Sequence, residues 1–161
     1  MAFNKRGGQR REKQEYEQKL LALDRVTRVV KGGRRFRFRA TLVIGNRRGK
    51  VGVGVAKGSD VSDSIQKAYN DGLKNLITVK MDGNTIPHEV LTKLGSAKVM
   101  LKPAAEGRGI IAGGSIRAVV DLAGIRDIVS KSMGSSNKLN VARATIAALQ
   151  SLKEPKVKVK K

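Results

Sequence analysis

The chain has 161 residues, no cysteine, 40% hydrophobic residues and a formal net charge of +21 at pH 7. This length fits one large domain or two small ones, and the absence of cysteine excludes disulfides and cysteine-based metal sites. The charge predicts an anionic partner, and nucleic acid is favoured over a membrane because no apolar stretch approaches the ~20 residues that span a bilayer.

The first predicted elements lie in a strongly basic region. Residues 1–15 are polar and charged, and we interpret them as a disordered basic arm. Residues 12–23 fit either a helix or the beginning of a strand, and their periodicity does not decide between the two. Residues 25–30 are predicted to form a strand, followed by a glycine-containing loop at Lys31–Arg34.

Two further strands are predicted from alternating side chains at residues 36–44 and 51–55, joined by a turn at residues 45–49. Phe36 and Phe38 share a face with aliphatic residues of the first of these strands, so we expect them in the core rather than stacked on bases. The simplest topology for the three strands is an antiparallel meander.

A helix is predicted next, because apolar residues recur at helical spacing from Val61 to about residue 78. Ser59 or Asp60 can cap its first turn. Together with the three strands, this helix gives a β-β-β-α unit over residues 16–80, with one helix packed on one face of the sheet.

The second half of the chain predicts another α/β unit, which places the whole chain in the α+β class. Residues 81–87 are the best linker candidate, residues 88–152 form the predicted C-terminal α/β domain, and residues 153–161 form a Lys-rich tail. The predicted strands are residues 88–93, 97–102, 110–111 and 125–132, and the predicted helices are residues 115–123, closed by Gly124, and a final helix after Gly134–Asn137.

Between Asp24 and Asp60 the chain carries eleven basic residues and no acid. Natural surfaces usually mix both signs, so we interpret this segment as a phosphate-binding surface rather than a solvated charged face. We expect Arg37 and Arg39 to lie beside both basic, glycine-containing loops. Backbone and shape recognition then favours structured RNA. The eleven residues are Arg25, Arg28, Lys31, Arg34, Arg35, Arg37, Arg39, Arg47, Arg48, Lys50 and Lys57.

The remaining motifs give little support for catalysis. Gly52–Gly58 misses the dinucleotide-binding pattern and Gly45–Val51 misses the Walker pattern, whereas Pro103–Gly114 can either hold a phosphate or only form tight turns. His88 is the only histidine, and the sequence shows no nucleophile–base pair or metal-ligand cluster. We therefore expect a protein that is not an enzyme and has no catalytic residue, cofactor or metal.

Several long motifs resemble the bacterial small-subunit ribosomal protein five family, and the resemblance covers about residues 17–152. It implies a double-stranded-RNA-binding-like β-β-β-α domain without its usual leading helix, and a long first strand over roughly residues 19–30. It also implies a C-terminal βαβ-type domain like domain two of ribosomal protein S-five, a fold shared with some small-molecule kinases. The motifs are Lys31–Phe38, Gly49–Gly54, Lys102–Gly114 and Gly134–Asn137, with shorter matches at Arg117–Val119, Leu122–Ile125 and Arg143–Thr145.

The resemblance also implies a function and partners. The protein would be a structural constituent of the small ribosomal subunit in the cytoplasm, bind small-subunit rRNA, support subunit assembly, line the channel through which mRNA enters and influence translational accuracy. Its implied partners are that rRNA, the mRNA, and ribosomal proteins four and eight, with no membrane. Arg108 departs from the family, which commonly has a small polar residue there. The implied contact with protein four comprises Glu106, Gly107, Arg108, Gly109 and Arg117.

The predicted RNA-binding residues fall in both domains. In the first, Gly32 and Gly33 join the eleven basic residues. In the second, Ser135, Ser136, Asn137 and Arg143 are chosen because a polar loop at a helix start commonly contacts phosphate. Two alternatives stay open, namely a free RNA-binding regulator or RNA chaperone, and a small-molecule kinase with the Gly107–Gly114 loop at its site.

Overall fold

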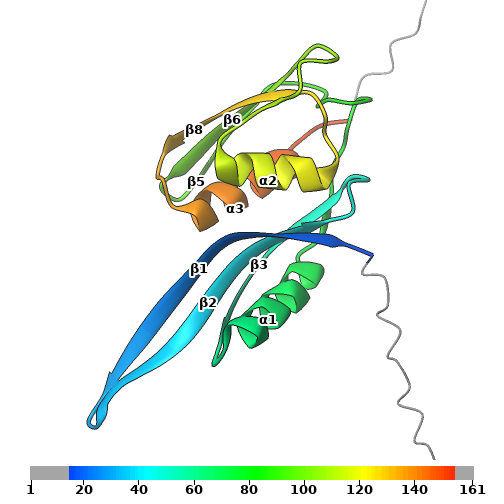
Figure 1. The fold of residues 1–161 in the computed structure, drawn as a ribbon. Coiled ribbons are helices and arrows are strands. Elements are labelled where there is room, and N and C mark those ends of the chain that lie inside the picture. Colours follow the sequence, from blue (N-terminus) through cyan, green and yellow to red (C-terminus); the bar gives the residue numbers. More distant parts are fainter. Residues whose placement is uncertain (1–14, 155–161) are drawn as a thin grey trace, which may run out of the picture.

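The computed structural model describes residues 15–154, which form two four-stranded sheets and three helices (Figure 1). The expected arm, except for residue 15, and the tail beyond residue 154 lie outside the described residues. The first sheet has the order β1-β2-β3-β4 and is antiparallel throughout. Its strands are β1 (Glu17–Val30), β2 (Gly33–Gly45), β3 (Lys50–Gly58) and β4 (Ile77–Thr78).

Helix α1 (Val61–Lys74) covers one face of this sheet and is shorter than predicted. Asp60 caps its first turn by accepting a 2.7 Å hydrogen bond from the backbone N–H of Val61. The prediction of a helix to about residue 78 is wrong, because Asn75 ends the helix and β4 pairs with the start of β3. The segment that fitted either a helix or a strand is a strand from Glu17 onward.

Glycines in β3 let α1 lie against the sheet at backbone distance. A Cβ added at Gly54 would collide with the carbonyl oxygen of Ala68, and one at Gly52 would lie 2.6 Å from that of Gly72. Neither position tolerates a side chain without moving the helix. The glycine run that resembles a failed dinucleotide motif is therefore a packing feature.

The second sheet has the order β5-β6-β8-β7, in which only β7 and β8 are parallel. The predicted strand at residues 125–132 begins later, because the backbone N–H groups of Arg126 and Asp127 donate to the carbonyl oxygen of Asn84. The elements are β5 (Val90–Leu94), β6 (Ala97–Pro103), β7 (Ile110–Ile111), α2 (Gly114–Ala123), β8 (Ile128–Gly134) and α3 (Lys138–Gln150).

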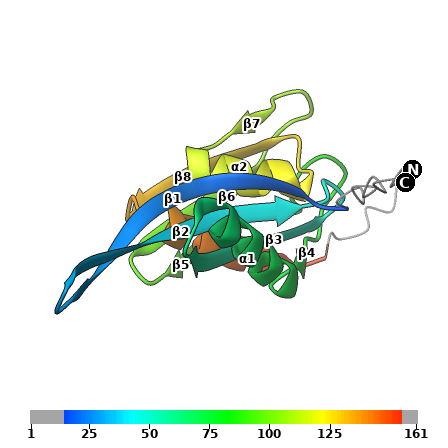
Figure 2. The ribbon, with the colours of Figure 1, turned by 60° about the horizontal axis from the view of Figure 1, so that its bottom comes forward.

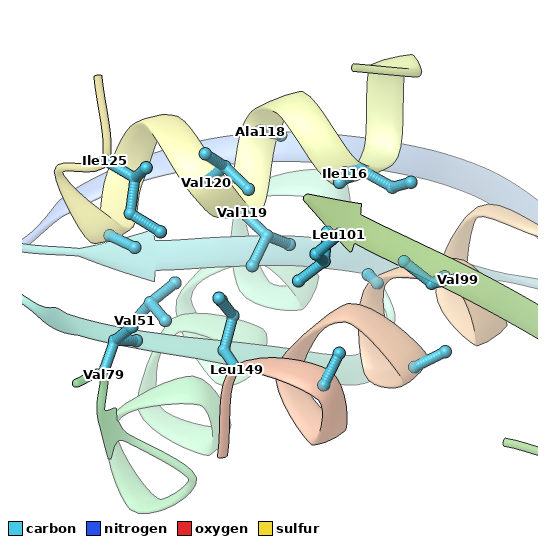
Figure 3. Close-up of a cluster of buried hydrophobic side chains, with 14 of the residues drawn as sticks. Val51, Val79, Val99, Leu101, Ile116, Ala118, Val119, Val120, Ile125 and Leu149 are labelled. Atoms are coloured by element: carbon cyan, nitrogen blue, oxygen red, sulfur yellow. The ribbon is translucent and has the colours of Figure 1, made fainter. Parts of the chain in front are cut away.

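Helices α2 and α3 lie between the two sheets and share one core with both (Figure 3). Val43 and Val51 of the first sheet belong to the same buried cluster as Leu101 of the second. The first sheet is thus covered on both faces where β2 is buried: α1 packs on one face, as predicted, and the layer of α2 and α3 covers the other. The segment at residues 81–87 contributes buried Ile86 to this cluster.

The β1–β2 hairpin projects beyond the rest of the first sheet (Figure 1). The last pair between β2 and β3 joins Phe38 to Gly58, and β1 and β2 continue from there as a two-stranded ribbon. No other element among residues 15–154 covers the ribbon (Figure 1), and Phe36 is 47% exposed. The prediction that Phe36 lies in the core is wrong, because β1 and β2 extend beyond the part of the sheet that α1 covers. Phe38 is half-buried where that cover ends.

Candidate nucleic-acid interface

One face of the hairpin carries a continuous set of cations, and we call it the inner face because it continues toward α3. Cross-strand pairing sets Arg28 opposite Arg35, Val26 opposite Arg37, and Arg39 opposite Lys57. Since alternate residues of a strand share a face, these side chains point the same way. The inner face comprises Asp24, Val26, Arg28, Val30, Arg35, Arg37, Arg39 and Lys57.

The inner face is hollowed into a groove of about 230 Å³ that is open to solvent along the ribbon. Valines form part of its floor, and four cations, Arg28, Arg35, Arg37 and Lys57, line it. A groove of this size is smaller than the roughly 300–1,000 Å³ of a small-molecule pocket. Its shape and charge suit a strand of phosphates running past it better than an enclosed ligand.

Two of the predicted RNA-binding arginines have acidic partners that the sequence did not suggest. Arg39 donates to Asp24 at 2.8 Å, and Arg47 forms an ion pair with Glu17 at 2.9 Å. Both pairs are solvent-exposed, so each contributes about 0–1 kcal/mol and leaves its arginine available to a competing phosphate. Within residues 15–154, the other nine basic residues of the segment form no ion pair.

The start of α3 lies at the base of the inner face. Asn137 and Lys138 line a cleft of about 280 Å³ together with Asp24 and Arg39 of the hairpin. Lys138 is a candidate contact that the prediction missed, although its position directly after the polar loop was a sufficient signal. The structure thus brings the second predicted region to the first and adds one cation.

Two side chains of the polar loop before α3 accept hydrogen bonds from the backbone of the loop and of the first turn of the helix. The Oδ1 of Asn137 accepts a hydrogen bond from the backbone N–H of Leu139, and the Oγ of Ser135 accepts one from Asn137. Ser136 and Arg143 are exposed, but Arg143 lines a separate cleft of about 380 Å³ beside β3. Asn137 therefore caps the helix with its Oδ1, and its backbone N–H and C=O are bonded as well, so its side-chain Nδ2 and the neighbouring Lys138 are the groups left to meet a phosphate.

The basic turn between β2 and β3 lies at the opposite end of the sheet from the hairpin tip (Figure 1). The thirteen residues of β2 separate Gly33 from Gly45 by about 40 Å at ~3.3 Å per residue. The expectation that Arg37 and Arg39 lie beside both basic loops is wrong, since a two-stranded pairing puts successive turns at opposite ends. Arg47, Arg48 and Lys50 therefore form a second basic site.

The residues predicted to contact a protein partner gather around β7, away from the hairpin (Figure 2). The Nη2 of Arg117 donates to the carbonyl oxygen of Ile110 at 3.1 Å, and buried Asp127 accepts a 2.8 Å hydrogen bond from the backbone N–H of Gly109. Glu106 and Arg108 are exposed on the loop that these bonds hold. The structure brings Arg117 and the loop together.

Displaced pKa values within residues 15–154 belong to α1 and not to the basic faces. The hydrogen bond from Lys67 lowers the pKa of Asp63, and burial raises the pKa of Tyr69. No helix among these residues has the length and hydrophobicity to cross a membrane, and no three of their acidic or histidine side chains cluster as metal ligands.

Comparisons with known proteins match nearly the whole of the described chain. The family described as "Ribosomal protein S5, N-terminal domain" matches residues 16–80, and "Ribosomal protein S5, C-terminal domain" matches residues 92–161. Curated relatives named "Small ribosomal subunit protein uS5" include those of Campylobacter jejuni strains 81-176, 81116 and RM1221. Each is 54% identical over 141 residues, which cover 88% of this chain and 96% of the relative.

Proposed function

The chain belongs to the ribosomal protein S5 family, and on that premise we propose that the inner face of its hairpin binds small-subunit rRNA. Membership makes it a protein of the small ribosomal subunit in the cytoplasm and confirms the predicted family and α+β fold class. The contact with rRNA, the residues that make it and the other binding partners are what we propose.

The observation that carries the proposal is a group of four unpaired cations on the inner face. Arg28, Arg35, Arg37 and Lys57 line one groove and form no ion pair within residues 15–154. Their mutual repulsion destabilises the free protein, and phosphates relieve that repulsion while releasing their own counterions. The start of α3 extends the surface, so we propose Lys138 and the side-chain Nδ2 of Asn137 as further phosphate contacts.

Shape recognition follows from how rigidly the two basic regions are joined. Helices α2 and α3 share one core with both sheets, which fixes the hairpin relative to the start of α3. A rigid pair of phosphate-binding surfaces selects RNA helices at a matching spacing. We propose that residues 16–80 and 88–152 act in this way as two linked RNA-binding domains and that locking an rRNA junction supports subunit assembly.

Further contacts are proposed at the two sites away from the hairpin. The exposed loop at Glu106–Gly109 with Arg117 is the proposed contact with ribosomal protein four, and protein eight is a second protein partner. Arg47, Arg48 and Lys50 form a separate basic site for rRNA or for mRNA near the channel through which it enters. An influence on translational accuracy would follow from holding these elements in place.

This work requires no catalysis, and we propose that the protein is not an enzyme. The kinase alternative needed a free phosphate-binding loop at Gly107–Gly114, but the backbone N–H of Gly109 is already bonded to Asp127. The regulator alternative shares the basic face and differs in location. Family membership places the chain in the small subunit and favours neither alternative.

A paired charge-reversal experiment tests the rRNA contact. Full-length Arg35→Glu/Arg37→Glu is compared with Lys93→Glu/Lys98→Glu, which changes the net charge equally through an exposed cross-strand pair on the second sheet. We expect the first variant to bind small-subunit rRNA fragments more weakly and to lower the salt slope by about one for each lost phosphate contact. Equal behaviour of the two variants would refute the proposed contact.

A further inference from the structure

The opposite side of the hairpin, which we call the outer face, has a different chemistry. It carries Phe36 and, diagonally across the ribbon, Arg25, whose guanidinium carbon lies 4.3 Å from the centre of the Phe36 ring. Phe36 is 47% exposed and the neighbouring Val29 is 75% exposed. The ribbon that carries this pair of a planar cation and an accessible aromatic ring projects beyond the rest of the first sheet (Figure 1).

The packing of residues 15–154 does not account for this exposure. Helix α1 packs on Ala40, Leu42 and Ile44 farther along the same face of β2, and the ribbon extends past it. Phe36 and Val29 expose apolar surface on the same face of the ribbon, and an exposed apolar patch commonly marks a binding site. Its position on a cationic ribbon instead suits a ligand that is both flat and anionic.

We infer that the Arg25–Phe36 pair is a stacking site for an unpaired nucleobase of RNA. The inference rests on the proposed function and adds a second mode of contact to it. Aromatic rings and guanidinium planes are the groups on which single-stranded bases stack, and such stacking tolerates any base. The pair thus provides a flat surface for a base beside cations that can hold its phosphates.

Charge favours RNA over an apolar protein surface as the occupant. Arg25 and Arg34 flank the exposed ring and form no ion pair with any residue of the described part of the chain. A protein that covered Phe36 would have to bury these cations or supply acids to match them, and burying an unpaired charge is costly. A nucleotide supplies both the flat apolar base and the phosphate.

The two faces of the hairpin then bind different parts of an RNA. The inner face, with Arg28, Arg35 and Arg37 but no aromatic side chain, contacts phosphates without regard to base pairing. The outer face holds a base that is not stacked in a helix. A ribbon two strands wide with these faces fits between a helical RNA segment and an unpaired nucleotide beside it.

Titration of the full chain with two RNA probes tests the inference. One probe is a single-stranded oligoadenylate with 2-aminopurine at one position, whose fluorescence reports stacking, and the other is a blunt duplex RNA. We expect Phe36→Leu to weaken single-strand binding on the order of 10-fold and to leave duplex binding unchanged. Phe36→Tyr keeps the ring and should bind both probes as the wild type does.

Two more variants separate stacking from charge and from exposed apolar area. Arg25→Lys keeps the charge but loses the guanidinium plane, so it should weaken single-strand binding alone. Val29→Ala removes a more exposed apolar side chain from the same face and should change neither affinity. Arg35→Glu/Arg37→Glu weakens duplex binding if the proposed function holds, whatever the outcome at Phe36.

Several results would overturn the inference. Phe36→Leu could bind single strands as tightly as the wild type, or it could weaken both probes equally. It could also bind both probes normally yet fail to enter small subunits, which would assign the outer face to a protein partner.

Discussion

The backbone N–H of Arg47 donates a 2.9 Å hydrogen bond to the carbonyl oxygen of Leu122. Two residues later, the backbone N–H of Gly49 donates a 2.8 Å hydrogen bond to the carbonyl oxygen of Ala123. The β2–β3 turn of the first sheet thus satisfies carbonyls that the end of α2 leaves without helical partners. The first sheet is fixed to α2 by backbone bonds as well as by the core that α2 and α3 share with both sheets, and this makes the spacing of the basic surfaces a property of the fold.

Gly124 makes this junction possible and gives the first prediction. It ends α2 with a φ of +93°, and a Cβ there would collide with the backbone of Arg47. We expect Gly124→Ala to lower the free energy of unfolding by about 2–4 kcal/mol, measured by urea denaturation. Gly113→Ala is the control, because nothing lies within 4 Å of a Cβ at that position. Equal stability of the two variants would contradict the role of the junction.

The contact between β3 and α1 gives the second prediction. Gly54→Ala would place a Cβ against the backbone of Ala68 and Gly72, so α1 must move away from the sheet or the sheet must bend. A destabilisation of about 2 kcal/mol or more is expected from such overpacking against backbone. Gly32→Ala, with open space around the added Cβ, should stay within about 1 kcal/mol of the wild type. An unaffected Gly54→Ala would show that the helix is not held at backbone distance.

Asp24 offers a way to raise RNA affinity. Its carboxylate accepts hydrogen bonds from both Nε and Nη2 of Arg39, so Asp24→Asn frees that cation on the inner face. We expect RNA to bind more tightly by up to about 5-fold, since a unit charge near 4 Å in water is worth about 1 kcal/mol. The gain should shrink with added salt.

The matched control for this change is Glu89→Gln. It removes the carboxylate that pairs with Lys102 at 3.2 Å on the second sheet and alters the net charge by the same amount. RNA affinity that rises equally in both variants would mean that overall charge, and not Arg39, is responsible.

Burial of Tyr69 gives a prediction for alkaline pH. Burial raises the pKa of its hydroxyl in the folded chain above the ordinary value of 10.0. As the pH rises, the unfolded chain therefore loses this proton before the folded chain does. The stability that the protonated hydroxyl gives the folded chain is fully present below about pH 10 and is lost as the pH rises through the folded pKa. The free energy of unfolding should decrease more between pH 9 and pH 11 for the wild type than for Tyr69→Phe. Parallel slopes would show that the hydroxyl titrates alike in both states.

Local pattern was sufficient for much of the fold. Alternation at residues 36–44 and helical spacing after Asp60 predicted β2 and α1, because a half-buried strand and an amphipathic helix impose their own periods. The same alternation misplaced Phe36, since it shows which face a side chain takes but not how far the covering helix extends. The end of α1 was misjudged because Ile77 fits a helical stripe as well as it fits β4.

The candidate site was predictable in composition but not in geometry. Charge density alone identified the basic segment, yet the Asp24–Arg39 and Glu17–Arg47 pairs depend on strand register, which sequence distance hides. The separation of Arg47 from the hairpin tip is likewise a consequence of strand length. The sequence pattern does not determine how distant strands pair, or how far the elements that cover them extend.

Directed cleavage of rRNA from the hairpin tests the central claim most directly. Because the chain has no cysteine, Val30→Cys creates a single attachment point for iron–EDTA on the inner face, and Leu91→Cys creates one on the exposed side of the second sheet. In assembled small subunits, hydroxyl radicals from Val30→Cys should cut rRNA backbone at a compact set of nucleotides that the Leu91→Cys probe leaves uncut. Subunits that incorporate the Val30→Cys probe and show no such cuts would contradict the account.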